Sequence, residues 1–158
     1  MKNQYRSYNN NGFQCSRCQY YVSSDPLIAG VKNRNHCPYC LWSRHVDLLE
    51  AGDRLAACKA NMQPIGLTLK RTRKKYGIAR YGELMLIHRC VECGSVSVNR
   101  IAADDDAALI FDIYRGSFQL DTHVKIELAI SGVNALGIVE GNIVQAQLYG
   151  KMHYEQEG

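Results

Sequence analysis

The chain has 158 residues, of which 46% are hydrophobic, and this length suits one domain or two very small ones. Residues 1–100 hold 16 Lys and Arg against 6 Asp and Glu, whereas residues 101–158 hold 3 against 9, so a basic part (+10) precedes an acidic part (−6). No apolar run approaches the roughly 18 residues of a membrane span, and the polar start of the chain is unlike a signal peptide, so we expect a cytoplasmic protein with no membrane partner.

The N-terminal pattern predicts a flexible tail followed by a metal-binding knuckle. Residues 1–11 are rich in Asn and are typical of a flexible tail. Residues 13–22 are expected to form two short strands joined by a turn that carries Cys15 and Cys18. A two-residue gap lets two thiolates reach one metal ion, as in zinc ribbons and zinc knuckles. Residues 23–35, with one proline and one glycine, are expected to form a loop.

A second pair, Cys37 and Cys40, is expected to open a short helix over residues 41–47. The N-terminus of that helix would help to stabilise thiolate charge, as in a treble-clef arrangement. The 18 residues between Cys18 and Cys37 fit the spacing of paired zinc-binding Cys-x-x-Cys units. The first two pairs therefore most simply share one metal ion.

Residues 65–98 have the pattern of a zinc ribbon. Apolar residues alternate over 65–69, and an apolar run covers 83–90, so we expect a β-hairpin with a long basic tip. Its second strand leads into a third pair, Cys90 and Cys93, and a strand over 95–98 leads out again.

The acidic part of the chain begins with a predicted helix. Asp104 opens a run of three aspartates, and a carboxylate at this position caps backbone N–H groups and favours the positive helix end. The helix is expected to end near Arg115, before Gly116. Apolar residues alternate over 124–130 and recur over 138–148, with glycines between, which predicts a small β unit.

These elements together predict a small metal-bound α+β protein in three parts. Residues 1–11 form the flexible tail. Residues 12–116 form a β-rich zinc-ribbon or treble-clef-like module with two short helices. Residues 117–158 form an appended C-terminal β extension, for which self-association is one possible use.

Two tetrahedral zinc sites need eight ligands, and seven thiols with one histidine supply that number. The odd thiol count and a reducing compartment argue against disulfides, and three pairs argue against a thioredoxin-like redox motif. The histidine could be His45, His88 or His36, with His123 and His153 less plausible. We favour His45 over His88, because it would tie the two sites together. Spacing alone also permits the first pair to join the third. The predicted ligands of two Zn²⁺ ions are Cys15, Cys18, Cys37, Cys40, Cys58, Cys90, Cys93 and His45 (or His88).

A series of short motifs surrounds the stretch Arg34-Asn35-His36-Cys37-Pro38. They are Phe13-x-Cys15-x-x-Cys18, Cys40-Leu41-x-Ser43-x-His45-Val46-Asp47, Gly52-Asp53-Arg54, Cys58, Met62, Pro64-Ile65-Gly66, His88-Arg89-Cys90-x-x-Cys93-Gly94, Asn99-Arg100-Ile101-Ala102 and Asp104-Asp105. The series resembles the RNHCP family of small zinc-binding domains over about residues 12–116, and the resemblance implies metal binding without naming an activity. Gln19 departs from the pattern, because glycine is the usual residue there, and this bears on the turn of the first knuckle.

The basic hairpin tip suggests a nucleic-acid partner. Cationic side chains neutralise phosphates, and aromatic rings stack on exposed bases. Charge runs are often only solvated faces, and arginines beside the Cys pairs can compensate thiolate charge. We nevertheless predict a structural zinc protein that binds RNA or a ribonucleoprotein such as the ribosome. The predicted contact residues are Lys70, Arg71, Arg73, Lys74, Lys75, Tyr76 and Arg80, with Tyr81 beside them.

Two other functions stay open. A protein-interaction module would use the acidic helix and the C-terminal segment. A zinc-dependent hydrolase would need an open metal position that activates water, with His36, His45, Asp47 and Asp53 as candidates. Thiolate-rich closed sites are structural, and no nucleophile elbow, phosphate loop or His-Glu-x-x-His pattern is present, so we expect no enzyme.

Overall fold

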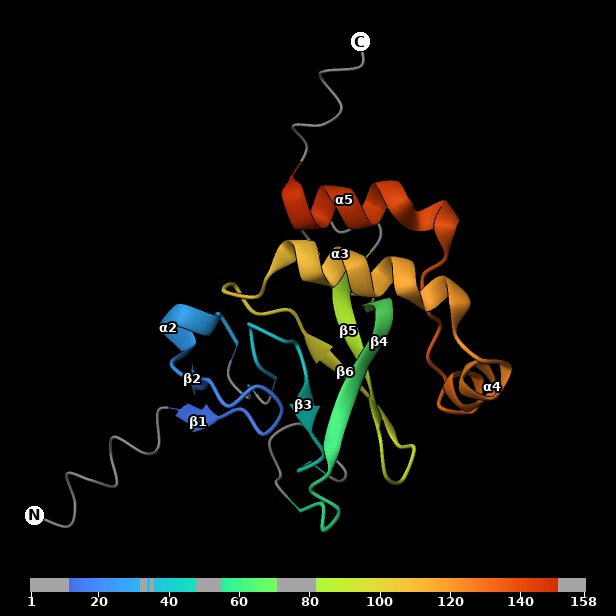
Figure 1. Cartoon of the computed structure of the whole chain (residues 1–158). Coiled ribbons are helices and arrows are strands. Elements are labelled where there is room, and N and C mark those ends of the chain that lie inside the picture. Colours follow the sequence, from blue (N-terminus) through green and yellow to red (C-terminus); the bar gives the residue numbers. More distant parts are fainter. Residues whose placement is uncertain (1–11, 32–33, 35, 48–54, 71–81, 151–158) are drawn as a thin grey trace, which may run out of the picture.

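Two antiparallel sheets and a group of helices make up the fold (Figure 1). The structure is a computed structural model, and it describes residues 12–31, 34, 36–47, 55–70 and 82–150. The small sheet pairs β1 (Gly12–Gln14) with β2 (Tyr21–Ser23). The larger sheet has the order β3 (Ser43–Arg44), β4 (Asn61–Lys70), β5 (Glu83–Cys90), β6 (Val96–Arg100). The predicted α+β class is confirmed, and the strands expected over 13–22, 65–69, 83–90 and 95–98 are present.

Strands β4 and β5 form the long hairpin at the centre of the larger sheet. They pair from Met62 and Cys90 at one end to Lys70 and Glu83 at the other. The register shifts at Pro64, which has no N–H to donate to the ladder, so a bulge is expected there. Gly66 allows close contact with the next layer, because a Cβ at this position would lie 3.1 Å from the Cβ of Ser117, a tight contact that Ser117 would have to relieve by moving.

Most of the helical residues follow the larger sheet in the chain. One short turn, α2 (Pro26–Ala29), comes earlier and interrupts the loop expected over 23–35; Asp25 caps its first turn and Gly30 ends it at φ 72°. The predicted helix after the aspartates is α3 (Ala107–Gly116), where Asp106 accepts from the N–H groups of Ala108 and Leu109. The later elements are η1 (Ser117–Gln119), α4 (Thr122–Ile130), η2 (Ile138–Glu140) and α5 (Gly141–Tyr149).

Strand β5 is covered on both faces, because successive residues of a strand point to opposite sides. Leu84 and Leu86 belong to a core cluster with Ile110 of α3 and Val144 of α5, whereas Ile87 packs in a second cluster with residues of α4. Figure 1 shows the same arrangement, with α3 between the sheet and α5. The apolar run over 83–90 is thus a strand buried on both sides.

The prediction of a C-terminal β extension is wrong, because the described part of residues 117–158 is helical. The alternation over 124–130 is not a strand pattern: Val124 and Leu128, four residues apart, are buried, whereas Ile126 and Ile130 are 54% and 81% exposed. That spacing matches one face of a helix. Gly132, at φ 73°, follows the helix as a C-terminal stop rather than as a β-turn.

The helix expected over 41–47 is also wrong. After Cys40 the chain turns at Leu41, which has a φ of 63°, and continues as the short strand β3. Strand pairing with β4 satisfies the backbone groups that a helix would have satisfied internally. Across the described ranges, no helix combines the length and the apolar character of a membrane span.

Candidate metal centres

The three Cys-x-x-Cys segments fold into the same knuckle. In each, the N–H of the residue after the second cysteine donates to the carbonyl of the first cysteine, at 2.8–3.1 Å. The N–H of that first cysteine donates to the carbonyl five positions later, at 2.8–3.0 Å. The residue after the second cysteine has a positive φ in all three, namely Gln19 (70°), Leu41 (63°) and Gly94 (75°). Gln19 therefore adopts the backbone conformation that glycine favours, and the first knuckle keeps the common turn.

The first two knuckles bring Cys15, Cys18, Cys37 and Cys40 together, with all four sulfurs within 4.8 Å of one another. Cys15 Sγ lies 3.6 Å from Cys40 Sγ, and Cys18 Sγ lies 3.6 Å from Cys37 Sγ. A tetrahedral zinc ion with bonds of about 2.3 Å would place its sulfurs about 3.8 Å apart, whereas a disulfide needs about 2.0 Å. The donor set and its spacing therefore fit a four-coordinate metal ion.

Strand β3 leads from the first cluster to a second. His45 directly follows it, and its Nδ1 lies 3.4 Å from Cys93 Sγ, while Cys58 Sγ lies 3.6 Å from Cys90 Sγ. The four ligand atoms lie within 4.8 Å of one another. The structure thus groups the first pair with the second, and places His45 rather than His88 with the remaining thiols. Both four-ligand Cys/His groups could hold a metal ion.

The two clusters differ in exposure. Cys15 and Cys37 are buried in the first cluster, whereas Cys58 and Cys93 are exposed in the second. Burial raises the pKa of the Cys37 thiol to about 11, so ionisation there needs a compensating positive charge. Hydrogen bonds from the hydroxyl and the backbone of Ser95 lower the pKa of Cys93 to about 6. These hydrogen bonds therefore favour the thiolate form of Cys93, which is the form that binds a metal ion.

A model of the RNHCP domain matches residues 10–111, which are 102 of the 158 residues. The chain belongs to the RNHCP domain family. No curated protein and no solved structure shows significant similarity to it.

The arginine and histidine of the RNHCP motif form a buried polar network rather than a metal site. The Arg34 side chain is fully buried; its guanidinium lies 2.8 Å from Asp104 and 3.2 Å from Asp105, and its Nε donates to the carbonyl of His36. His36 Nε2 lies 2.6 Å from Asp105, whose carboxylate also accepts from the N–H of Ala102. The network joins the second knuckle to the turn that starts α3. In the sequence these residues stand out only as motif positions, and no local pattern indicates that they are buried together.

His88 has a structural role beside this network. It is fully buried, its Nε2 donates to the carbonyl of Leu41 at 2.7 Å, and its Nδ1 accepts from Asn99 at 2.8 Å. Burial, with the neighbouring His36, lowers its pKa to about 3, so the ring is neutral. Both ring nitrogens are thus engaged in the RNHCP core, and His88 holds the second knuckle against β6.

The arginines near the knuckles divide into two groups. Arg34, Arg89 and Arg100 pair with carboxylates, the last two with Glu127 and Glu83. Arg17 instead lies over the ring of Trp42, and Arg44 Nε donates to the carbonyl of Lys59. Of the predicted RNA-contact residues, the structure describes only Lys70, at the exposed end of β4; Arg71, Arg73, Lys74, Lys75, Tyr76 and Arg80 lie outside the described residues.

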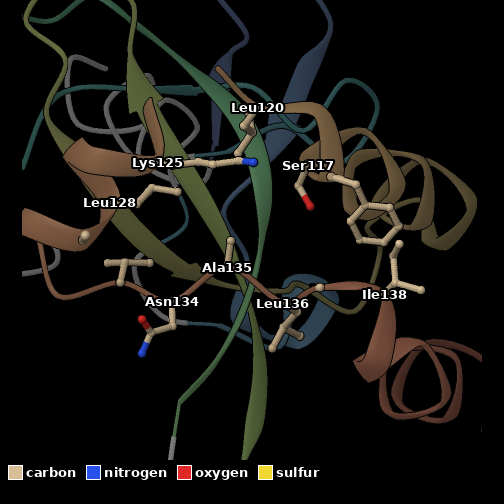
Figure 2. Close-up of a pocket in the computed structure, with 12 residues that line it drawn as sticks. Ser117, Leu120, Lys125, Leu128, Asn134, Ala135, Leu136 and Ile138 are labelled. Atoms are coloured by element: carbon tan, nitrogen blue, oxygen red, sulfur yellow. The ribbon is translucent and has the colours of Figure 1, made fainter. Parts of the chain in front are cut away.

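A hollow of about 440 Å³ lies between η1, α4 and the segment before η2 (Figure 2). Its lining is mostly apolar, with Lys125, Ser117 and Asn134 as the labelled polar residues. Among the described residues, no cysteine, histidine or carboxylate lines it. The described lining therefore offers no Cys, His or carboxylate ligand for a metal ion, and Lys125 is its one ionisable side chain. Of the hydrolase candidates, His36 is engaged with Asp105, His45 belongs to the second cluster, and Asp53 lies outside the described residues.

Proposed function

We propose that this RNHCP protein is a structural zinc protein that binds RNA, or a ribonucleoprotein such as the ribosome, through the basic segment 70–81. One observation carries the proposal: this segment joins the two longest strands of the metal-stabilised sheet. The pairing of β4 and β5 runs to Lys70 and Glu83, so the chain between them starts and ends at one edge of the fold. It contains six Lys or Arg residues and no acidic residue.

Zinc is the metal that the donor sets favour. Four thiolates, or three thiolates and one imidazole, are the ligand sets of structural zinc sites. Such sites are closed, because the protein fills all four positions, and they contribute folding energy directly. Metal binding matters most for the stability of small sheets such as these, since a short chain buries little apolar surface and gains little folding energy from its core. Closed coordination also favours a binding protein over a hydrolase.

Electrostatics supports RNA over a neutral partner. A cluster of cations without local carboxylates gives a positive field that a phosphate backbone neutralises. Arg34, Arg89 and Arg100 are paired with carboxylates, whereas segment 70–81 concentrates six cations with no acidic residue among them.

The test replaces Lys70, Arg71, Arg73, Lys74 and Lys75 with Gln. RNA affinity should fall, and the slope of log K against log salt should flatten by about 0.7–0.9 for each phosphate that the variant no longer neutralises. Metal content and the unfolding midpoint should hardly change. The control replaces Lys125 and Arg115, two cations of the acidic part of the chain, with Gln. Unchanged RNA affinity and unchanged co-sedimentation with ribosomes, at both low and moderate salt, would contradict the proposal.

A protein-interaction module is the second candidate, and the C-terminal helices favour it. Ile130, Ile138 and Val139 are 81%, 75% and 89% exposed, which is unusual for such large apolar side chains. If the basic-segment variant keeps its RNA binding, or if the protein binds no RNA, substitution of these three residues by Ser becomes the decisive experiment. Loss of self-association or of a protein partner would then assign the function to this surface.

A further inference from the structure

The two knuckles of the first cluster each place flat side chains at equivalent positions. Two residues after its first cysteine the first knuckle has Arg17 and the second has Tyr39; five residues after it they have Tyr20 and Trp42. The pairs cross from one knuckle to the other. Tyr20 packs against Tyr39 with ring centroids 5.1 Å apart, and Arg17 lies 4.9 Å from the centroid of Trp42. The first cluster thus carries two pairs, and each pair joins one side chain of the first knuckle to one of the second.

The knuckle fold does not require these side chains. The third knuckle has the same backbone hydrogen bonds, and it carries Glu92 and Ser95 at the two equivalent positions. Burial does not explain the tyrosines either, because Tyr20 is 63% exposed and Tyr39 is 59% exposed. Aromatic rings that are exposed and already paired lose little conformational entropy on binding, which favours a role in recognition.

The cations beside the rings are available for an anionic partner. Among the described residues, neither Arg17 nor Arg44 has a carboxylate within ion-pair distance, in contrast to Arg34, Arg89 and Arg100. Arg44 borders the first knuckle, since it pairs with Asn61, whose side chain accepts from the hydroxyl of Ser16. It also lies two residues after Trp42, on the solvent side of β3, while Ser43 between them is buried.

We propose that the Tyr20–Tyr39 and Arg17–Trp42 pairs form a stacking surface for unpaired RNA bases, with Arg17 and Arg44 facing the phosphates. The inference rests on the proposed RNA-binding function and adds a second surface to it. Rings and guanidinium planes stack on any base, so the surface would select single strands rather than a sequence. A protein partner would need apolar anchors and a closed fit, whereas paired rings flanked by two arginines that have no carboxylate partner among the described residues match bases and phosphates.

The new surface and Lys70, the first residue of the basic segment, lie at opposite ends of β4. Asn61 contacts the first knuckle, and Lys70 is nine residues further along the strand. At about 3.3 Å per residue, the two ends are about 30 Å apart. A stacked strand needs about nine nucleotides to cover this distance at about 3.4 Å each. An RNA of about four nucleotides is therefore too short to span from the first knuckle to Lys70, and one of about twelve can span that distance.

Trp42 is the single tryptophan of the chain, so its fluorescence reports on the stacking surface alone. An unstructured RNA of about four nucleotides should quench Trp42 emission in a saturable way. The double variant Tyr20→Ser, Tyr39→Ala, whose first change copies Ser95 of the third knuckle, should weaken this binding by about tenfold or more. Its salt slope should stay unchanged, because no charge is removed. Tyr20→Phe with Tyr39→Phe should retain the affinity, since stacking needs only the rings.

The outcomes separate the two proposals. If the longer RNA binds but leaves Trp42 emission unchanged, and the Tyr20→Ser, Tyr39→Ala variant binds it equally well, the stacking surface is overturned and the basic segment stands. If the short RNA quenches Trp42 in the basic-segment variant as in the parent, the stacking surface is supported even where the basic segment fails. If neither RNA binds, both proposals fall. If the double variant Tyr20→Ser, Tyr39→Ala releases metal and the double Phe variant also fails to bind RNA, the rings only shield the metal cluster and the stacking surface is overturned.

Discussion

Asp105→Asn is expected to destabilise the metal-loaded protein far more than Asp104→Asn, although both change one carboxylate in the same turn. The Asp105 side chain is fully buried and accepts from three donors: Arg34, His36 and the N–H of Ala102, at 3.2, 2.6 and 2.8 Å. The Asp104 side chain is 31% exposed and contacts Arg34 at 2.8 Å. Removal of the first carboxylate thus leaves more buried groups without partners.

The magnitude follows from burial. An Asn amide offers one acceptor oxygen, so at least one buried donor would face its NH₂ group, and Arg34 would keep a single carboxylate. Removal of one partner from a buried ion pair costs about 3–5 kcal/mol, whereas a partly exposed pair is screened and contributes about 1 kcal/mol or less. At about 2–4 °C per kcal/mol for a chain of this length, the midpoint should fall by about 6–20 °C for Asp105→Asn and by about 4 °C or less for Asp104→Asn.

The assay is thermal unfolding, followed by circular dichroism, of variants matched for metal content. Asp112→Asn is the surface control, because its i,i+3 pair with Arg115 is more than half exposed on both sides. Equal midpoint shifts for Asp104→Asn and Asp105→Asn would refute the argument that the RNHCP motif stabilises the fold through a buried network. An unchanged midpoint for Asp105→Asn would refute the contacts themselves.

Three further outcomes test the metal centres and the helical region. Elemental analysis should find two zinc ions per chain, and a ratio near one in the parent would mean that one cluster is incomplete. Cys37→Ser should release one ion and lower the unfolding midpoint strongly, because this ligand is fully buried. Substitution of the exposed ligand, Cys93→Ser, should release one ion with a smaller shift of the midpoint. Cobalt substitution should give tetrahedral thiolate spectra that azide leaves unchanged, since closed sites have no exchangeable ligand; an anion-dependent shift would favour the hydrolase. Leu128→Ala should cost about 2–5 kcal/mol in one cooperative transition with the sheet, because Leu128 packs against Ile65 and Ile87, and separate melting of the two regions would contradict this.

The strands and the knuckles could be predicted because their signals are local. The two-residue spacing of each pair dictates a turn, and the alternation over 65–69 and the apolar run over 83–90 directly describe paired strands. The start of α3 was predictable for the same reason, since Asp106 caps backbone groups two and three residues away. Local chemistry decides all of these elements.

The errors arose where tertiary contacts decide. Four β-branched or apolar residues at alternating positions suit a strand, yet Val124 and Leu128 face β5 while Ile126 and Ile130 remain exposed. Only the position of the sheet determines whether these residues form a strand or a helix with one buried face. In the same way, the segment after Cys40 becomes a strand because β4 lies beside it. The Tyr20–Tyr39 and Arg17–Trp42 pairs also depend on how the first two knuckles pack against each other, and no local sequence pattern shows this packing.

The route of the chain through β3 implies an order in which the protein acquires its two metal ions. The first cluster closes within 26 residues, from Cys15 to Cys40, whereas the second must gather ligands from His45 to Cys93. Shorter closures cost less entropy, so we expect the first ion to bind a largely unfolded chain. Only five positions separate Cys40 from His45, and this first event would deliver the histidine to the place where β4 and β5 later bring the other thiols. A metal titration should therefore show two phases. Under metal shortage the half-loaded protein would have its first two knuckles assembled, while the third knuckle and the central hairpin stay unfinished.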